Sequence, residues 1–405
     1  MTRSKSRIQA KVPRRAARPV PSHPAGPTLG IIGGGQLARM LAQAASRLGC
    51  ATVILEREAG VPAAQVTDAV ITGDWNEPGS LVRLGRRADV VTLENEFVDA
   101  HGLASLEKTG RALWPSAATI DAIQDKLRQR EVLVAAGLPV PCFAAVPDRR
   151  ALAKLGEMLG WPIMVKRRRN GYDGKGNFTL RSAAEIGAAW RHLGAVENSM
   201  LAEVFCRYRK ELAVMVCRGR DGSIATYPVV ETVQRDHICH IVSAPAAIDS
   251  EIAQRAVDIA RRAVDAFGGV GCFGVELFLM PDGDIVINEL APRVHNSGHY
   301  SMEACACSQF ENHVRAVLGW PLGSTAMVAP AAVMINLLGA SGGSGRPHGL
   351  ERALAIQGAH VHVYGKARSA RGRKMGHVTA LGATVGEAMR RARRAARLVR
   401  FGDVS

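Results

Sequence analysis

The sequence VELFLMPDGDIVINELAPRVHNSGHY at residues 275–300 decides how the rest of the chain is interpreted. Two apolar, β-prone runs flank Pro-Asp-Gly-Asp, a composition typical of a β-hairpin. If those four residues form the loop, Met280 pairs with Ile285. Counting back from that pair places Glu276 opposite Glu289. Two carboxylates that face each other inside apolar strands are unfavourable unless a cation lies between them.

A hard cation such as Mg²⁺, with Asn288 close by, is the occupant that the facing carboxylates favour. The alternative is one exposed carboxylate and one that is buried and neutral. The loop after the second strand is polar and contains Arg293, His295, Asn296 and His299. Because reactive side chains gather in loops at strand ends, the hairpin predicts a metal site that continues into a reactive loop.

The composition sets bounds on the kind of protein. The chain has 405 residues, 47% of them apolar, which is enough for two or three domains with a large core. No apolar run approaches the roughly 18 residues needed to cross a bilayer, so no membrane association is expected. The eight cysteines form no CxxC pair. Reduced, buried thiols in a cytoplasmic protein are favoured over disulfides or a zinc site.

The net charge of +16 suggests nucleic-acid binding, but its distribution argues against that function. Residues 1–27 contribute +7 and residues 367–405 contribute +8, which leaves the body of the chain at +1. No basic face is therefore expected on the folded body, and no nucleic acid is expected as a partner. Residues 1–27 are predicted to be a disordered extension, with a transit peptide as the alternative.

Residues 28–56 contain every local part of a dinucleotide-binding fingerprint. A strand runs into GGGQLA at residues 33–38, a helix follows, and a second strand ends at Glu56. The physical content is that free backbone amides at a helix N-terminus bind an anion. A phosphate of any ligand satisfies them, and so does a purely structural turn. Further βα units complete a domain that closes near residue 115.

The middle of the chain carries cations at the ends of predicted elements. A helix from about residue 116 to 136 contains Lys126, and a strand ends at Lys166. The following stretch, RRRNGYDGKGN at 167–177, is either a mobile loop that folds over phosphates or a solvated hairpin turn. A further strand follows at 200–205, and Glu211 opens the next strand.

Taken in order, these features resemble the ATP-grasp superfamily. The strings VKRRRNGYDGKGN, INELAPRVHNSGH, SQFENHVRAVLGWPL, VMINLLG and HVYGKARSARGRKMGHV are similar to those of the N5-carboxyaminoimidazole ribonucleotide synthases, the ATPase subunits of phosphoribosylaminoimidazole carboxylase. With GIIGGGQLARML at the front, the resemblance covers about residues 28–380. Five separate strings in family order are specific, whereas the glycine-rich fingerprint alone is not.

The resemblance implies an α/β and α+β architecture, an ATP-grasp fold with a Rossmann-like αβ domain before it and a small β-rich domain after it. The expected divisions are a disordered extension, the Rossmann-like domain, the ATP-grasp domain, the C-terminal domain and a basic helix and tail, at residues 1–27, 28–115, 116–321, 322–385 and 386–405.

The resemblance also implies an ATP site in which lysines and the glycine-rich loop bind the phosphates, one segment lines adenine, and an acid takes the ribose. Its residues are Lys126, Lys166, Gly171, Tyr172, Asp173, Gly174, Lys175, Gly176, Asn177, Glu203, Val204, Phe205, Cys206, Glu211, Gln234, Asn288 and Glu289. Glu203 would accept a hydrogen bond from the adenine amine. Mg²⁺, with Mn²⁺ as an alternative, would be held by Glu276 and Glu289.

A second substrate site is implied for 5-aminoimidazole ribonucleotide. Its binding residues are Gln36, Leu37, Glu94, Asp173, Asn296, Lys366 and Arg373, and the expected catalytic residues are Tyr172, Lys175, Arg293, His295 and Lys366. Two positions are left open by departures from the family pattern. Gln234 stands where a histidine is usual, with His237 as the alternative contact, and either Glu94 or Glu96 faces the site. The histidines at 299 and 313 are expected to be structural, whereas His377 either holds substrate phosphate or caps a strand.

The implied reaction is carboxylation of 5-aminoimidazole ribonucleotide by bicarbonate and ATP, through carboxyphosphate, in de novo purine (IMP) biosynthesis. The products are N5-carboxyaminoimidazole ribonucleotide, ADP and phosphate. A cytoplasmic homodimer is expected from the family. Three other classes stay open: an NAD(P)-dependent oxidoreductase, a nucleic-acid-binding protein, and a formate-using formyltransferase or another carboxylate–amine ligase of the same superfamily.

Overall fold

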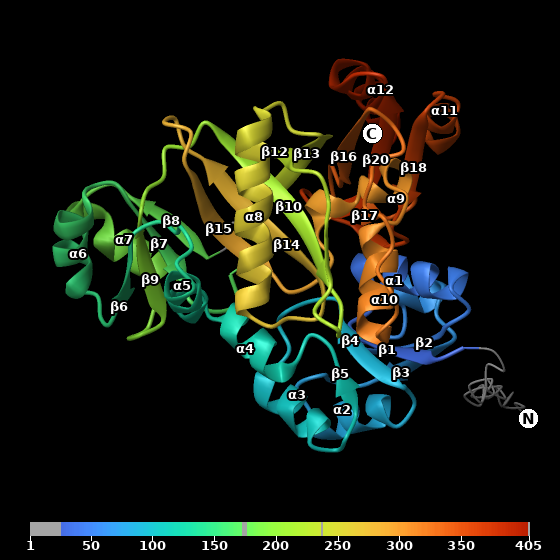
Figure 1. Ribbon diagram of the computed structural model, residues 1–405, viewed down its shortest axis with the longest axis horizontal. Coiled ribbons are helices and arrows are strands. Elements are labelled where there is room, and N and C mark those ends of the chain that lie inside the picture. The colour runs from blue at the N-terminus through green and yellow to red at the C-terminus, as the bar shows by residue number, and fades with distance from the viewer. Residues whose placement is uncertain (1–25, 172–175, 236–237, 404–405) are drawn as a thin grey trace, which may run out of the picture.

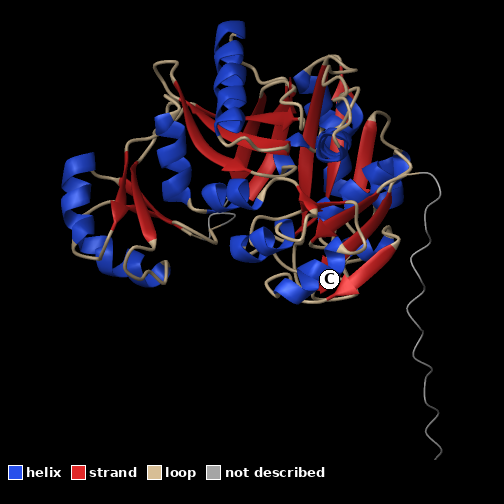
Figure 2. Cartoon of the chain, turned by 60° about the horizontal axis from the view of Figure 1, so that its bottom comes forward, coloured by secondary structure: helices blue, strands red, loops and turns tan. Residues whose placement is uncertain are grey.

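The computed structural model describes residues 26–171, 176–235 and 238–403. Three larger sheets organise the molecule (Figure 1): a parallel sheet near the N-terminus, a small antiparallel sheet, and a long antiparallel sheet that runs from the centre to the C-terminal end. The small sheet and its helices form a lobe at one end, as Figure 2 shows from another direction. No helix in the described part of the chain is both long and apolar enough to cross a membrane.

The N-terminal unit is a five-stranded parallel sheet in the order β3-β2-β1-β4-β5. Its strands are β1 (Thr28–Ile32), β2 (Ala51–Glu56), β3 (Ala69–Thr72), β4 (Val90–Leu93) and β5 (Ala112–Leu113). The helices are α1 (Gln36–Arg47), the 3₁₀ turn η1 (Pro62–Gln65), α2 (Pro78–Gly85) and α3 (Ala100–Glu107). The apolar strands alternate with helices, as covered parallel sheets require, and the predicted βα units are observed.

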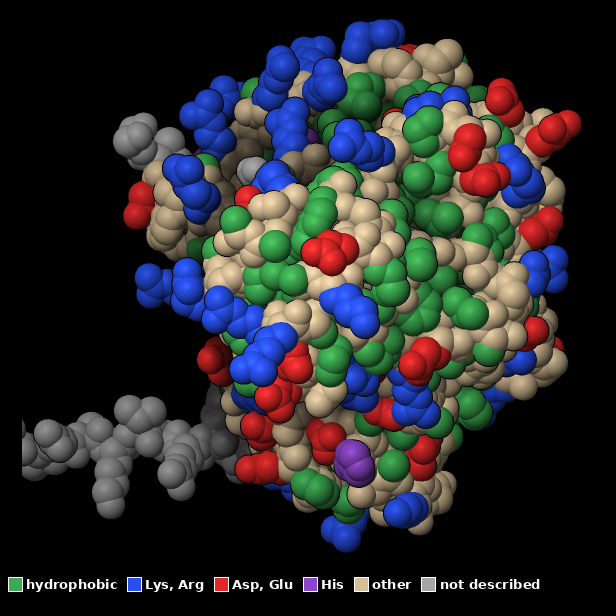
Figure 3. Space-filling view, turned by 90° about the vertical axis from the view of Figure 1, so that its left-hand side faces the viewer, with side chains coloured by type: hydrophobic (Ala, Val, Ile, Leu, Met, Phe, Trp, Pro, Cys, Tyr) green, Lys and Arg blue, Asp and Glu red, His purple; other side chains and the backbone are tan. Residues whose placement is uncertain are grey.

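The end lobe is built on an antiparallel sheet in the order β6-β9-β7-β8. Its elements are β6 (Phe143–Val146), α6 (Ala151–Leu159), β7 (Ile163–Arg167), β8 (Asn177–Leu180), η2 (Ala183–Glu185), α7 (Ile186–His192) and β9 (Met200–Val204). The predicted hairpin on either side of the glycine-rich loop is observed, with Val165 paired to Phe178. The acidic and basic side chains of this end of the molecule are interspersed over much of its surface, with Lys and Arg denser on one side (Figure 3).

The single helix predicted over residues 116–136 is wrong. The chain forms α4 (Ala117–Gln124) and α5 (Lys126–Ala135), with the extended residue Asp125 between them. The Asp125 carboxylate accepts hydrogen bonds from the backbone amides of Leu127 and Arg128 and so caps α5. As a result Lys126 begins a helix instead of lying inside one.

The long sheet has the order β15-β14-β10-β12-β13-β16-β20-β18, with β11 paired to β10. Its central part comprises β10 (Lys210–Arg218), β11 (Ile224–Thr226), β12 (Val230–Arg235), β13 (Ile238–Ala244), β14 (Gly271–Leu279) and β15 (Ile285–Ala291), with α8 (Ser250–Ala266) packed on one face. The turn η3 (Asn296–Gly298) and the helices α9 (Ser301–Ala304) and α10 (Gln309–Leu318) follow β15.

The C-terminal strands continue this sheet instead of forming a sheet of their own. They are β16 (Ala331–Leu338), β18 (Ala359–Val363) and β20 (Lys374–Gly382), accompanied by the short pair β17 (Gly343–Ser344) and β19 (Arg368–Ser369) and by α11 (Leu350–Leu354) and α12 (Val385–Leu398). Since β16 pairs with β13 along Ile241 to Ala244, hydrogen bonds cross the expected domain boundary at residue 322. The β-rich character is as expected.

In the hairpin of β14 and β15, Glu276 faces Glu289 as predicted, but the strand register that brings them together is not the predicted one. Leu279, not Met280, pairs with Ile285, so the predicted loop is one residue too short. A register shift between Glu276 and Leu277 leaves Asn288 as an extra residue in β15, and this β-bulge restores the pairing of Glu276 with Glu289.

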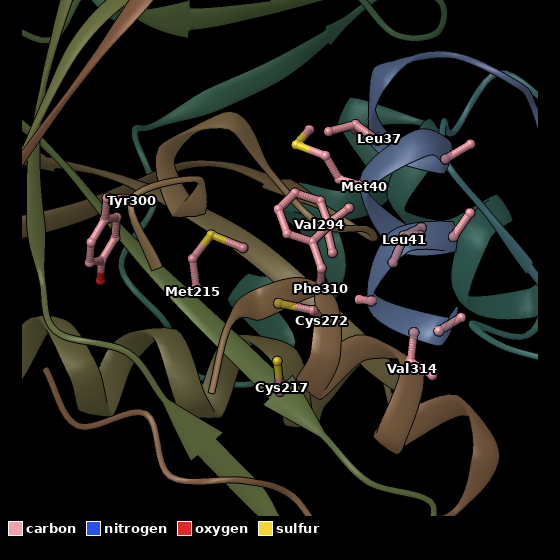
Figure 4. Packing of buried hydrophobic residues seen from close by; sticks show 14 of the residues in the cluster. Leu37, Met40, Leu41, Met215, Cys217, Cys272, Val294, Tyr300, Phe310 and Val314 are labelled. Carbon is pink, nitrogen blue, oxygen red and sulfur yellow. The ribbon is translucent and has the colours of Figure 1, made fainter. Parts of the chain in front are cut away.

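One continuous core joins the N-terminal unit to the long sheet (Figure 4). Leu37, Met40 and Leu41 of α1 pack with Phe310 and Val314 of α10. The same cluster includes the buried side chains Met215, Cys217, Cys272, Val294 and Tyr300 of the sheet and the loop after it. The N-terminus of α1 is therefore fixed relative to that loop. All eight cysteines are free.

Candidate active site

The bulge in β15 places three oxygen-bearing side chains at one point of the long sheet. Glu276 and Glu289 are cross-strand partners. The Asn288 amide donates to Glu276 Oε2 at 3.3 Å, and its Oδ1 accepts from Lys166 Nζ at 3.3 Å. Burial and the neighbouring Glu289 carboxylate raise the pKa of Glu276 to about 7. The raised pKa shows that ionising both carboxylates is unfavourable, as the sequence predicted for two carboxylates that face each other.

These residues fit a divalent metal ion. Carboxylate and amide oxygens are the ligands that Mg²⁺ prefers, and the ion would relieve the repulsion between Glu276 and Glu289. Burial tends to raise the pKa of Glu289, but the charge of Lys126 outweighs it and lowers that pKa below its usual value. Glu289 is therefore already an anion, as a metal ligand must be.

Three cations form ion pairs with Glu289 and with a further carboxylate, that of Glu203. Lys126 Nζ lies 2.5 Å from Glu289 Oε1, and Lys166 Nζ lies 2.6 Å from Glu203 Oε2. Arg130 Nε contacts the other oxygen of Glu203 at 2.6 Å. The two lysines come from the start of α5 and from β7, so the helix break at Asp125 and the strand end converge on one spot, as the sequence predicted for phosphate-binding groups.

The segment expected to line adenine begins in the last two residues of β9 and continues past its end. The Glu203 carboxylate is held by Lys166 and Arg130, and the backbone of residues 203 and 204 pairs with the neighbouring strands β6 and β7. The backbone of residues 205 and 206, beyond the strand, is the part of the segment left for an adenine edge. Glu211, the expected ribose acid, accepts a hydrogen bond from the Tyr208 hydroxyl. The Tyr208 ring stacks on Phe278 with centroids 4.4 Å apart. Gln234 lies near the end of β12, at a second register shift, and its predicted contact stays a prediction.

The glycine-rich loop is described only at its ends. Tyr172, Asp173, Gly174 and Lys175, like His237, lie outside the described residues. At the base of the loop a side chain on Gly176 would come within 2.8 Å of the Gly171 Cα, so the two glycines let the strands meet closely. Asn177 begins β8. A cavity of about 270 Å³ adjoins this base and is lined by residues that include Glu96, Lys126, Arg169, Gly171 and Glu289.

Arg293 and His295 project from the loop after β15. The Arg293 guanidinium forms a two-pronged ion pair with Glu96, with Nη2 at 3.0 Å from Oε1. His295 Nε2 lies 3.7 Å from Glu276 Oε1, and its Nδ1 lies 2.9 Å from Ser297 Oγ. Burial and the charges of Arg293 and Lys374 lower the pKa of His295 to about 3, so its imidazole is neutral.

Of the two acids left open, Glu96 is the one beside Arg293, while Glu94 lies at the N-terminus of α1. Glu94 accepts hydrogen bonds from the amides of Gly35 at 2.6 Å and Ala38 at 2.9 Å. Glu56 accepts from Gly34 at 2.8 Å. The chain's own carboxylates therefore fill the anion site of the fingerprint, and a dinucleotide pyrophosphate there would meet two negative charges. Substrate binding by Glu94 stays a prediction.

The remaining expected substrate residues are spread over the junction with the C-terminal strands. Gln36 is partly exposed, but the Leu37 side chain is in the core, which leaves only its backbone for a ligand. Lys366 Nζ donates to the Lys374 carbonyl at 2.7 Å and lies over the Tyr364 ring. Arg373 is exposed and donates to the Arg368 carbonyl at 2.8 Å.

Asn296 is hydrogen-bonded to the C-terminal strand β16, because its amide donates to Asn336 Oδ1 at 3.1 Å.

Two residues that support the site, Gln309 and Arg130, were missed by sequence reasoning. Gln309 is fully buried and clamps the backbone of His295, accepting from its amide at 2.9 Å and donating to its carbonyl at 2.7 Å. The other is Arg130, whose signal was its position four residues after Lys126, on the same face of a helix.

The fold and the site define the class of protein: an ATP-grasp ligase. Family models agree, matching the ATP-grasp domain at residues 131–310, the ribonucleotide synthetase preATP-grasp domain at 27–124 and the phosphoribosylaminoimidazole carboxylase C-terminal domain at 332–391. The predicted ATP-grasp fold with its two flanking domains is confirmed.

Individual relatives narrow the class. The chain is 44% identical to the N5-carboxyaminoimidazole ribonucleotide synthase of Synechococcus elongatus, over 87% of this chain and 88% of the relative. It is 41% identical to the chloroplastic phosphoribosylaminoimidazole carboxylase of Vigna aconitifolia over 88% of this chain, and spans 64% of that relative's length. The Aspergillus clavatus N5-carboxyaminoimidazole synthase, solved with ADP and 5-aminoimidazole ribonucleotide, is 37% identical with a TM-score of 0.84, covering 92% of this chain and 98% of that one. The chain belongs to the N5-carboxyaminoimidazole ribonucleotide synthase family.

Proposed function

We propose that this protein carboxylates 5-aminoimidazole ribonucleotide with bicarbonate and ATP, yielding N5-carboxyaminoimidazole ribonucleotide, ADP and phosphate in purine biosynthesis. Bicarbonate attacks the γ-phosphate to form carboxyphosphate, which releases CO₂ beside the substrate amine. The observation that carries the proposal is the grouping of Glu276, Asn288 and Glu289 with Lys126 and Lys166. Phosphoryl transfer needs such cations and metal ligands and no covalent nucleophile.

The ATP half of the site would work by charge placement. Lys126 and Lys166 bind phosphate oxygens, and Glu276, Glu289 and Asn288 hold Mg²⁺, or Mn²⁺ as the alternative. The metal, when bound, would neutralise charge that develops on the transferred phosphoryl group. Because Lys126 now pairs with Glu289, the arriving phosphate and metal would each take one partner of that ion pair.

The carboxylation half would use the loop after β15. Arg293 provides a rigid fork for an oxyanion such as carboxyphosphate. Its present partner is the Glu96 carboxylate, so binding would exchange one anion for another at the same guanidinium. Because the pKa of His295 is lowered to about 3, its imidazole stays neutral and adds no charge beside Arg293. Its Nδ1 accepts from the Ser297 amide, which fixes the orientation of the ring.

A phosphate-release assay tests the reaction. We expect release that requires Mg-ATP, 5-aminoimidazole ribonucleotide and bicarbonate together, with label from ¹⁴C-bicarbonate in an acid-labile product. Release driven by formate in place of bicarbonate would assign the chain to a formyltransferase. A thermal-shift panel gives an independent measure, because a ligand of the native state raises the melting temperature. Stabilisation by NAD and not by Mg-ATP would favour an oxidoreductase.

We also propose a cytoplasmic homodimer, on the resemblance to the family alone. Light scattering coupled to size exclusion measures the assembly directly. A mass near twice the 43.2 kDa of the chain is expected, and a monomer at micromolar concentration would contradict it.

A further inference from the structure

Three side chains on one face of helix α5 contact three consecutive residues of β15, at positions 288–290. Lys126 binds the Glu289 carboxylate. Gln129 makes two hydrogen bonds with the backbone of Leu290, at 3.1 and 3.2 Å. Arg130 Nη2 donates to the carbonyl of Asn288 at 2.6 Å. Positions 126, 129 and 130 lie on the same side of a helix, so the helix is docked against the bulge that carries the metal ligands.

Arg130 makes a second contact that no other side chain of α5 makes. Its Nε donates to Glu203 Oε1, and the other oxygen of Glu203 takes Lys166, each at 2.6 Å. The side chains of Arg130 and Glu203 are each 2% exposed and that of Lys166 is 8% exposed, so all three are shielded from solvent. The one guanidinium thus links the end lobe, through Glu203 of β9, to the long sheet, through Asn288 of β15.

The charges of this cluster do not cancel. Glu203 alone would neutralise Lys166 and hold it in a buried ion pair, where it would have no net attraction for a phosphate. With Arg130 present, one carboxylate is shared by two cations, and the cluster keeps a charge of +1. Burial alone would raise the pKa of Glu203, but Lys166 and Arg130 lower it to about 2, so the carboxylate stays ionised.

We infer that Arg130 is a positioning residue for nucleotide binding: it shares the Glu203 carboxylate with Lys166, so that the cluster keeps a net positive charge for phosphate, and it fixes the carbonyl of Asn288 so that the bulge presents Glu289 and Asn288 to the metal. Arg130 touches neither substrate nor metal. This role deepens the proposed function and rests on it for the identity of the nucleotide.

The test compares Arg130→Met with Arg130→Lys, which retains the charge. For Arg130→Met we expect the KM for ATP and the Mg²⁺ concentration at half-maximal rate to rise by at least about tenfold, which corresponds to the loss of one charged hydrogen-bonding group. The KM for 5-aminoimidazole ribonucleotide should change by less than about twofold, because Arg130 contacts no residue expected at that site. Arg130→Lys should recover most of the ATP affinity.

Arg128→Met is the matched control. Arg128 lies on the same helix, is 51% exposed and forms its ion pair with Asp121, away from Glu203 and Asn288, so its loss should leave all three parameters unchanged. Arg130→Gln, whose amide can still donate to the Asn288 carbonyl, replaces Arg130→Met should the latter fail to fold. A folded Met or Gln variant with unchanged KM for ATP and unchanged Mg²⁺ requirement overturns the inference, as does an equal rise in both KM values.

Calorimetric titration with Mg-ADP separates this inference from the proposed reaction. Wild-type protein that binds Mg-ADP but does not carboxylate the ribonucleotide would disprove the proposed function and leave Arg130 testable by its ADP affinity. Weaker ADP binding in Arg130→Met, with melting temperature near that of Arg128→Met, supports positioning. An equal ADP affinity in the two variants refutes it.

Discussion

At the scale of single residues, the site depends on carboxylates whose neighbours decide their charge. Glu276 and Glu289 are partners across the same pair of strands, yet the pKa of Glu276 is raised to about 7 and that of Glu289 is lowered. The difference comes from Lys126, which contacts Glu289 at 2.5 Å. Two identical side chains thus acquire different protonation behaviour from one lysine, which is how paired carboxylates are usually differentiated.

Glu289→Gln should lower turnover by at least about a hundredfold, because the neutral side chain removes a negative charge that would attract the metal and that pairs with Lys126. Steady-state phosphate release at saturating Mg-ATP measures the effect. Asp284→Asn, in the exposed turn of the same hairpin, is the control and should retain normal turnover. Near-normal activity of the Glu289 variant would refute the metal-site argument.

Lys366→Ala should chiefly weaken binding of the ribonucleotide. Lys366 lies in the C-terminal part of the chain, where its Nζ donates to the Lys374 carbonyl. We expect the KM for 5-aminoimidazole ribonucleotide to rise about tenfold or more, since the proposed charged hydrogen bond from Lys366 to the substrate would be lost. The KM for ATP should be unaffected. An effect on ATP alone contradicts the assignment.

At the scale of elements, the break between α4 and α5 has the clearest consequence for the site. Asp125 caps α5 and binds Arg168 through both carboxylate oxygens, at 2.7 and 3.0 Å. The backbone amide of Lys126 donates to the Arg168 carbonyl at 2.8 Å. The start of α5 is therefore fastened to the end of β7, which brings Lys126 and Lys166 to neighbouring residues of β15, Glu289 and Asn288.

Asp125→Ala should destabilise the protein by about 2–4 kcal/mol, the combined loss of a helix cap and a partly buried ion pair. It should also raise the KM for ATP, because Lys126 follows directly. Asp125→Asn keeps a capping oxygen and should recover part of the stability. Urea unfolding midpoints and ATP kinetics provide the measurements. A KM for ATP that stays normal in the alanine variant would show that the cap does not position Lys126.

At the scale of the whole molecule, His313 connects two sheets that are distant in sequence. Its Nε2 lies 2.8 Å from Thr92 Oγ1 of the parallel sheet, and its Nδ1 accepts from the Cys272 amide of β14 at 3.0 Å. The structural role expected from the sequence is what this geometry shows. Burial lowers the pKa of His313 from 6.5 to about 4, so the folded protein holds the imidazole neutral.

Acidification should therefore destabilise the fold through His313. In the unfolded chain the imidazole takes a proton near pH 6.5, whereas in the folded protein it does so near pH 4. Stability that is present above pH 6.5 is lost as the pH falls through this interval, by up to about 3 kcal/mol. His313→Gln should flatten the pH dependence of the urea midpoint between those values. His101→Gln, at a side chain that is 98% exposed, is the control. An unchanged slope in the His313 variant would contradict this account.

The sequence predicted most local elements and the chemistry of the hairpin, because these follow from nearby residues. Period-two and period-3.6 apolar patterns place the strands and helices of the N-terminal unit. The pairing of Glu276 with Glu289 came from counting along a hairpin, although it holds only because the longer loop and the bulge at Asn288 compensate each other. Local sequence does not specify such a bulge, since its stability depends on Arg130 and Gln129 from another element.

The sequence by itself determined the family resemblance, the order of the domains and the residue types of the site. Tertiary structure alone decided which groups are partners: that Glu94 and Glu56 bind the backbone amides at and before the start of α1, that Glu96 binds Arg293, and that Glu203 is shared by Lys166 and Arg130. Tertiary structure also decided that β16 extends the long sheet. The physical reason is the separation along the chain over which each kind of interaction acts. Propensity and periodicity act over a few residues, whereas ion pairs and sheet edges join positions 73 to 197 residues apart, which only the packed chain brings within 3 Å.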